Sequence, residues 1–198
     1  MPKVKLSIDC SGHNASVLLS DHNERHLCPV TCDTSDQLLF YTLPKILKEN
    51  EIDISDINLI AWGQGPGSFT GIRICATWLQ TLSYIQSTKV IPICSLRARA
   101  QEHIEQHNIT SGQLTTYLSA NRVYAYFGQW KVSDGLIVPL KPVSVVNKDE
   151  LKSADIDLGS YEATALNIDK LSKPLEAELS QHVSPFEIRP NYLFDHFS

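Results

Sequence analysis

The chain has 198 residues, 42% of them hydrophobic and 20% charged, which is enough for a folded core in one large or two small domains and excludes disordered and fibrous classes. The 17 Lys and Arg residues against 22 Asp and Glu give a formal net charge of −5. Without a run of basic residues there is no footprint for a phosphate backbone, so we expect no nucleic-acid binding by this chain alone.

The first forty residues are typical of three strands in an antiparallel meander. Val4, Leu6 and Ile8 alternate with polar residues, and turn-forming residues separate them from strands predicted at 15–20 and 25–31. A helix follows, opened by the capping box Thr34-x-x-Gln37. Its apolar residues recur at helical spacing, and a proline inside it predicts a kink; these residues are Leu39, Leu43, Ile46, Leu47 and Pro44.

A βα unit is predicted next. A strand at 57–62 leads into the loop GQGPGSFTG at 63–71 and a helix at 72–86, followed by a strand at 90–94 and a helix from its cap Ser95 to His107. After a linker at 108–112, strands are expected at 113–119, 123–132 and 136–145, then a short helix at 148–153 and a strand at 156–158. The order partly repeats, so we predict a duplicated α/β fold with a truncated second copy, divided into residues 1–107 and 108–198.

The glycine loop resembles a phosphate-binding loop only superficially. It contains no lysine, which a P-loop needs, and its glycines have the wrong spacing for a dinucleotide fingerprint. We therefore predict a structural turn that packs a helix on a sheet, with Ser68 or Thr70 capping that helix. The turn consists of Gly63, Gly65, Pro66, Gly67, Ser68, Thr70 and Gly71.

Several stretches resemble the TsaB (YeaZ) family of tRNA threonylcarbamoyladenosine biosynthesis. GPGSFTGIR resembles the family signature, and LSIDCSGHNASVLL, SDQLLFYTLPKIL, RVYAYFGQW and PFEIRPNY resemble other family segments in the same order. The resemblance covers nearly the whole chain. It implies an α/β actin-like fold of the sugar kinase, Hsp70 and actin superfamily, with two ribonuclease-H-like lobes.

The resemblance also implies a function. We expect a non-catalytic scaffold and activator that binds a TsaD-like transferase, with a TsaE-like ATPase joining the complex, tRNA bound only through the complex, and a homodimer when the chain is alone. The alternative is a small nucleotide-dependent phosphotransferase or a metallopeptidase-like hydrolase of the same superfamily. We predict no catalytic, cofactor-binding or metal-binding residue, and no cofactor.

Departures from the family pattern support that expectation. Ser119 to Arg122 stand where relatives have Asp-Ala-Arg, so an acid that could hold a nucleotide-bound metal is missing. The metal histidines of TsaD correspond here to Ser95 and Arg99. His103 and His107 lie four residues apart, but we interpret them as a solvated helix face, and Asp9 as an inherited turn residue.

The helix at 72–86 has two neighbouring apolar stripes, of which one sheet covers only one. Together with the preceding helix it is predicted to form the partner surface, through Leu38, Leu39, Thr42, Ile46, Ile72, Ala76, Leu79 and Ser83.

Cysteine usage and hydropathy indicate the compartment. Five cysteines without a CxxC pair favour reduced thiols. The uncharged run 74–88 is too short and too polar to span a bilayer, and no signal-peptide core lies between Lys5 and Asp9. We expect a cytoplasmic protein without a membrane partner.

Overall fold

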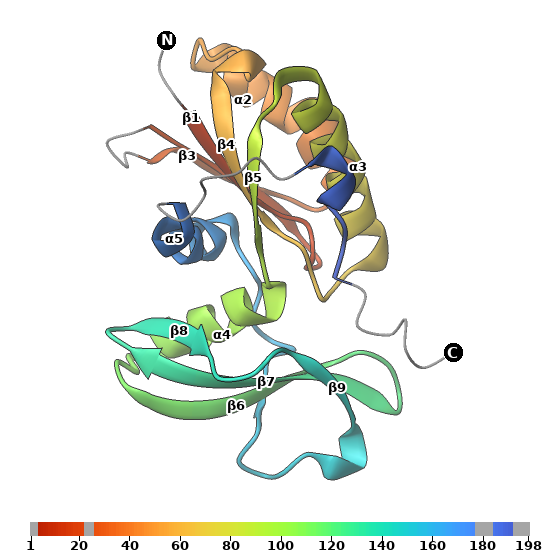
Figure 1. The fold of residues 1–198 in the computed structure, drawn as a ribbon, viewed down its shortest axis with the longest axis vertical. Coiled ribbons are helices and arrows are strands. Elements are labelled where there is room, and N and C mark those ends of the chain that lie inside the picture. Colours follow the sequence, from red (N-terminus) through yellow and green to blue (C-terminus); the bar gives the residue numbers. More distant parts are fainter. Residues whose placement is uncertain (1–3, 22–25, 177–183, 192–198) are drawn as a thin grey trace.

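The computed structural model describes residues 4–21, 26–176 and 184–191, and Figure 1 shows them as two β-sheets with helix α4 between them. The first sheet has the order β3-β2-β1-β4-β5, with the first three strands antiparallel and the other two parallel to β1. This confirms the predicted meander. The strands are β1 (Val4–Asp9), β2 (Ala15–Ser20), β3 (His26–Cys32), β4 (Ile57–Gly63) and β5 (Lys89–Ile93).

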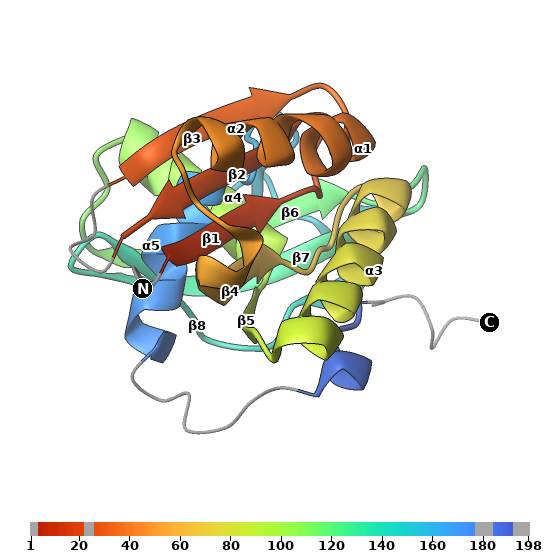
Figure 2. The same ribbon diagram turned by 90° about the horizontal axis from the view of Figure 1, so that it is seen from above.

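Helices cover one face of this sheet, as Figure 2 shows from above. The irregularity predicted at Pro44 is a π-helical turn just before it, in which the Leu43 amide reaches back to the Leu38 carbonyl. A wider turn of this kind accommodates a residue that lacks an N–H. The helices are α1 (Ser35–Gln37), η1 (Leu38–Thr42), α2 (Leu43–Glu49), η2 (Ile54–Asp56) and α3 (Phe69–Gln86).

The opposite face is covered by α5 (Ala165–Glu176), a helix that we did not predict. Lys5 and Ser7, which alternate with the apolar residues of β1, point to this helix, where Lys5 Nζ lies 2.8 Å and Ser7 Oγ 3.0 Å from Oδ1 of Asp169. The polar positions of β1 therefore form a buried contact, although their alternation is equally typical of a strand with one face in water.

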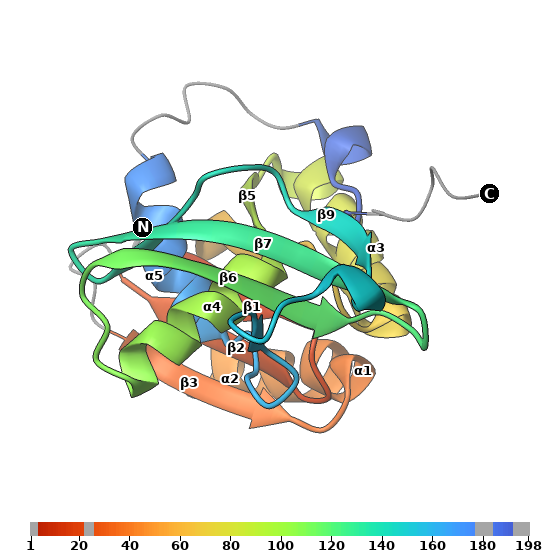
Figure 3. The ribbon, with the colours of Figure 1, turned by 90° about the horizontal axis from the view of Figure 1, so that it is seen from below.

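The second sheet packs on α4 (Ser95–Gln106) with the order β10-β6-β7-β8, and β9 also pairs with β7. In Figure 3 this sheet lies between the viewer and α4. The predicted strand at 136–145 is two strands, because Pro139 and Pro142 lack an amide hydrogen and interrupt it. The predicted short helix is the 3₁₀ turn η3 (Lys148–Glu150). The strands are β6 (Gly112–Ser119), β7 (Tyr124–Ser133), β8 (Leu136–Pro139), β9 (Ser144–Asn147) and β10 (Ile156–Asp157).

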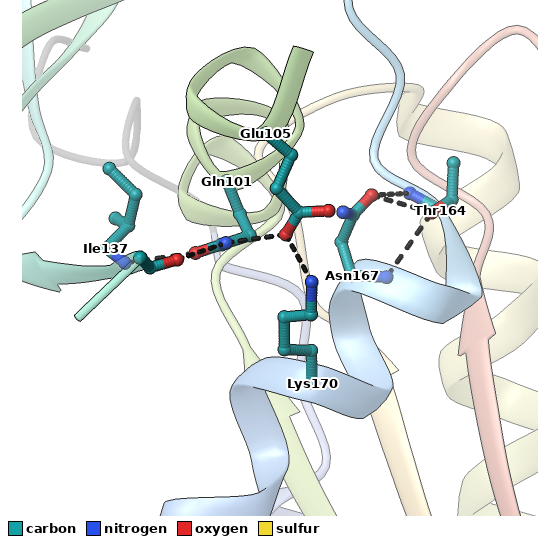
Figure 4. Close-up of polar contacts among 7 residues, drawn as sticks. Gln101, Glu105, Ile137, Thr164, Asn167 and Lys170 are labelled. Atoms are coloured by element: carbon teal, nitrogen blue, oxygen red, sulfur yellow. Dashed lines mark hydrogen bonds and ion pairs between the residues drawn. The ribbon is translucent and has the colours of Figure 1, made fainter. Parts of the chain in front are cut away.

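A polar network ties α4 to the second sheet and to α5 (Figure 4). Gln101, fully buried, donates to the Gly135 carbonyl at 2.9 Å and accepts from the Ile137 amide at 3.0 Å. It also donates to Glu105, whose Oε1 lies 2.6 Å from Nζ of Lys170 on α5. Helix α4 is thus held on both sides by hydrogen bonds.

The segment 184–191 returns to the first sheet through the turn η4 (Pro185–Glu187). The Ile188 side chain is buried in the core beneath α3, and its carbonyl accepts from Gln80 at 2.7 Å. The division at residues 107 and 108 stays a prediction. In the described ranges, the helices are all too short or too polar to cross a membrane.

Candidate functional site

The glycine loop packs directly on the turn between β1 and β2. The Ser68 amide donates to the Ser11 carbonyl at 2.8 Å, and a Cβ added at Gly67 would overlap that same carbonyl oxygen. Gly71 lies equally close to the Cys10 carbonyl, while Gly65 has a φ of +99°, which favours glycine. The backbone of the loop therefore touches other backbone, as a structural turn requires.

Ser68 caps α3, as predicted, by accepting from the Gly71 amide at 3.3 Å. Helix α3 begins at Phe69, three residues earlier than the apolar periodicity indicated. The predicted cap Ser95 is wrong, because Cys94 is the N-cap of α4 and Ser95 is its first residue. The Ser95 hydroxyl is used elsewhere, next to Asp9.

Asp9 lies at the end of β1, fully buried among groups of this chain. Its Oδ1 accepts from the amide and the hydroxyl of Ser11, each at 2.8 Å, and its Oδ2 accepts from Ser95 Oγ at 3.1 Å. Burial raises the pKa of Asp9 to about 6, although the Ser11 hydrogen bonds and the charge of Arg99 act in the opposite direction. Both oxygens of the Asp9 carboxyl thus accept hydrogen bonds from groups of this chain.

Arg99, the second position at which the resemblance implies a metal histidine in TsaD, lies in the same cluster. It is 6% exposed, and it donates to the carbonyls of Tyr161 and, at 3.5 Å, of Ser11. Burial lowers the pKa of Arg99, while the charge of Asp9 raises it. Through these hydrogen bonds, Ser95 and Arg99 connect α4 to the β1–β2 turn and to the chain before α5.

Ser119, the other position that departs from the family pattern, lies exposed at the end of β6. Its hydroxyl donates to the Asn121 carbonyl at 3.3 Å and accepts from Lys148 Nζ at 2.6 Å. Hydrogen bonds of this kind stabilise a turn.

The solvated-face interpretation is wrong for His103, which is 8% exposed, whereas His107 is exposed. The two rings stack with centroids 4.3 Å apart, and His103 also packs edge-on against Tyr161 at 5.0 Å. Burial and the neighbouring His107 lower the pKa of His103. Within the described part of the chain, no three His, Cys, Asp or Glu residues are grouped so that they could hold a metal ion.

The residues predicted to form the partner surface are mostly in this chain's own core. Seven of the eight have exposed fractions between 0% and 5%, and Thr42 alone is partly exposed. The residues of α3 that we expected to contact a partner belong to the stripe that faces the sheet. The seven buried residues are Leu38, Leu39, Ile46, Ile72, Ala76, Leu79 and Ser83.

The other side of α3 carries an apolar groove of about 530 Å³ that Phe40 of η1 helps to form. Phe40 is 58% and Ile85 74% exposed. The spacing of Ile74, Trp78 and Ile85 places them on one helix face. The groove is lined by Phe40, Arg73, Ile74, Thr77, Trp78, Thr81, Leu82 and Ile85.

A sequence signal for this groove did exist. The residues of α3 that face the sheet include the small Gly71, Ala76 and Ser83, which let the helix approach the strands closely, whereas Trp78 and Ile85 are large. Small residues on one side of a helix therefore indicate the side that packs closely on a sheet.

The arrangement of the first sheet and its helices defines the class of protein, which is an actin-like α/β protein. The solved structure titled "YeaZ from Pseudomonas aeruginosa" has the same fold: its TM-score is 0.82 at 21% identity, over 96% of this chain and 100% of that chain.

Sequence comparisons give the family. The family model described as "TsaD: tRNA N6-adenosine threonylcarbamoyltransferase" matches residues 34–171, more than half of the chain. A TsaB protein of Haemophilus influenzae is 31% identical over 60% of this chain, and one of Buchnera aphidicola subsp. Baizongia pistaciae is 29% identical over 66%. The matches cover only 51% and 59% of the length of these two relatives. The chain belongs to the family that this model describes and, within it, to the TsaB/YeaZ proteins of tRNA threonylcarbamoyladenosine biosynthesis.

Proposed function

We propose that this chain is a non-catalytic subunit of the machinery that forms N6-threonylcarbamoyladenosine in tRNA. In this proposal it binds a TsaD-like transferase through the groove on η1 and α3. The observation that carries the proposal is the exposed apolar character of this groove. Of the six most exposed large hydrophobic side chains described, five lie on η1 and α3: Phe40, Tyr41, Phe69, Tyr84 and Ile85.

A concentration of this kind is costly on an isolated surface. When a partner covers large apolar side chains that are exposed to water, the free energy falls by about 25 cal/mol per Å² of apolar surface buried. Contiguous exposed apolar patches therefore mark interaction sites. Because one end of the groove is formed by a different element from the rest, a partner helix would contact η1 and α3 together.

The environment of Asp9 supports a non-catalytic role. In a phosphotransferase or a metal-dependent hydrolase, the carboxylate at this position would face a metal or a substrate. Here both oxygens of Asp9 accept hydrogen bonds from Ser11 and Ser95, and the glycine loop has no lysine. Neither observation favours the alternative of an enzyme.

The remaining partners follow from the same proposal. A TsaE-like ATPase would join the complex, tRNA would be bound through the complex, and an isolated chain would pair with itself through the same groove. The cytoplasm, where tRNA is modified, would be the compartment.

Co-purification with a TsaD homologue tests the partner and the surface. Thr81 is exposed and lines the groove, so Thr81→Glu should leave the chain folded while it places a charge in the interface. We expect the affinity for the TsaD homologue to fall at least about tenfold. The matched control Thr110→Glu, at an exposed position before β6, should bind as the wild type does.

Two results would contradict the proposal. One is a folded Thr81→Glu variant that still captures the TsaD homologue with unchanged affinity, because the interface would then lie elsewhere. The other is ATP hydrolysis by the purified chain that disappears in the variant Asp9→Ala, because the chain would then be an enzyme.

A further inference from the structure

Phe186 of η4 is the one of the six most exposed large hydrophobic side chains described that lies outside η1 and α3. Its exposed fraction is 72%. The turn η4 nevertheless packs on α3, and Gln80 of α3 donates at 2.7 Å to the carbonyl of Ile188, which directly follows the turn. All six side chains therefore belong to α3 and the two elements beside it.

The segment 184–191 follows α3 on the side opposite the groove. Gln80 lies in the second half of the helix, and the Gln64 carbonyl, which accepts from the Asn191 amide at 2.9 Å, lies in the loop before the helix. Figures 2 and 3 both show η4, the short blue turn, on one side of α3 and the orange helices α1 and α2 on the other. Helix α3 is thus flanked by η1 and by this segment.

Tyr84 lies on the side of α3 that faces η4. It follows Gln80 by four residues, so both side chains are on one helix face, and it is 75% exposed. Ile188 is buried in the core beneath α3 and anchors the turn that carries Phe186. Tyr84 and Phe186 together form an exposed apolar surface on a fixed part of the fold, which we call the η4 patch.

The exposed apolar area indicates how much of this surface a stable complex uses. A large apolar side chain buries about 200 Å², and the six side chains are between 58% and 75% exposed, which gives an area on the order of 800 Å². One partner contributes about this area to a stable interface. Without the η4 patch the six are reduced to four and the area to roughly 500 Å², which is typical of weaker contacts.

We propose that the η4 patch is a second part of the docking surface, so that the TsaD-like partner covers α3 from both sides and not through the groove alone. The inference rests on the proposed function, because it concerns the same partner. Phe186 and Tyr84 lie against apolar residues of the partner, and the segment 184–191 thereby contributes to binding. Large aromatic side chains at the centre of an interface carry much of the binding energy.

The variant Phe186→Ala tests the inference, with Leu140→Ala as its matched control. Leu140 is also an exposed apolar residue, 47% exposed, but it lies just after β8 in the second sheet. We expect calorimetry to show an affinity of Phe186→Ala for the TsaD homologue about tenfold below that of the wild type, and an unchanged affinity of Leu140→Ala. Urea unfolding should show that both variants are as stable as the wild type, because both side chains are exposed.

Cross-linking gives a second measurement that does not depend on affinity. The photoreactive residue benzoylphenylalanine replaces Phe186 in one protein and Leu140 in another. We expect illumination of the complex to join position 186, and not position 140, to the TsaD homologue. Wild-type affinity of Phe186→Ala, or equal cross-linking at the two positions, would overturn the inference.

The remaining outcomes separate this inference from the proposed function. If Phe186→Ala weakens only self-association in sedimentation equilibrium, the η4 patch serves a homodimer and the inference is wrong. Loss of binding in Thr81→Glu with an unchanged Phe186→Ala would leave the groove as the interface and overturn the inference alone. Loss of binding in Phe186→Ala with an unchanged Thr81→Glu would support the η4 patch and contradict the groove. A chain that does not bind the TsaD homologue at all would overturn both.

Discussion

Ser95 donates its hydroxyl hydrogen to Oδ2 of Asp9 over 3.1 Å and so joins the first residue of α4 to the end of β1. The Oγ of Ser95 also accepts a hydrogen bond from the Gly65 amide at 3.1 Å. Three segments that are far apart in the sequence thus meet at one side chain. A Cβ at Gly63 would overlap Asp9 and approach Ser95, so the contact also requires a glycine there.

Burial of Asp9 predicts a specific dependence of stability on pH. Its pKa is raised from 3.8 to about 6 in the folded chain, so between these values the folded state binds more protons than the unfolded state. The contribution of Asp9 to the free energy of unfolding is therefore largest below pH 4 and is lost as the pH rises through about 6. In Asp9→Asn this contribution disappears, while the amide can still accept from Ser11 and donate to Ser95.

Urea unfolding of both proteins at pH 4.5, 5.5 and 7 measures the effect. The stability of Asp9→Asn relative to the wild type should rise with pH over this range. Asp53 provides the control, because hydrogen bonds from Ser55 lower the pKa of its exposed carboxyl. Stability due to Asp53 is lost only as the pH falls below about 4, so the difference for Asp53→Asn should stay nearly constant from pH 4.5 to 7. A pH-independent difference for Asp9→Asn would mean that Asp9 does not titrate in this range.

The glycine loop makes a prediction about stability. In Gly67→Ala the new Cβ would overlap the Ser11 carbonyl, a backbone atom that cannot rotate away. We expect a loss of about 1–3 kcal/mol in the free energy of unfolding, measured by thermal or urea unfolding. Gly159→Ala is the control, because its nearest neighbour is the movable Asp157 carboxylate. A Gly67→Ala variant as stable as Gly159→Ala would show that the loop tolerates a side chain there.

The sequence predicted the elements whose patterns are local. The meander, the βα unit and the Ser68 cap follow from alternation, helical spacing and glycine content, and each is present. These features depend on residues close together in the chain, which sequence patterns describe well.

Features that depend on distant contacts were missed. Nothing near Ser7 indicates that Asp169 of α5 would cover it, and Pro174 inside α5 weakens the helical pattern of that segment. The two apolar stripes of α3 look alike in a hydropathy pattern, and packing on the first sheet determines which one is buried. The hydroxyl of Ser95 likewise fits a helix cap by its position, but it serves Asp9 instead.

The burial of Leu79 gives a prediction that separates the core from the groove. Leu79 is fully buried and Ile85 is 74% exposed on the same helix. Leu79→Ala should lower the free energy of unfolding by about 2–5 kcal/mol, because it leaves a cavity, whereas Ile85→Ala should change it by about 0.5 kcal/mol or less. Partner affinity should show the reverse pattern, with a loss for Ile85→Ala. Equal stability losses in urea unfolding would contradict the assignment of the two faces.

The last prediction concerns Gln101, which links α4 to the β7–β8 turn. Its side chain donates to the half-buried Gly135 carbonyl and accepts from the buried Ile137 amide, so Gln101→Leu leaves both without this partner. Buried groups that lose a hydrogen bond cost about 1–3 kcal/mol each. We expect a loss of that order in the free energy of unfolding, together with faster hydrogen exchange of the Ile137 amide.

Gln106→Leu is the matched control for this experiment. Gln106 lies on the same helix, is exposed and donates to Glu102 in an exposed hydrogen bond, so its replacement should change stability by about 0.5 kcal/mol or less. The exchange rate of the Ile137 amide distinguishes a local effect from a general one. If Gln101→Leu lowers stability while this amide stays as protected as in the control, the leucine disturbs packing, and the hydrogen bonds of Gln101 are not what holds the second sheet to α4.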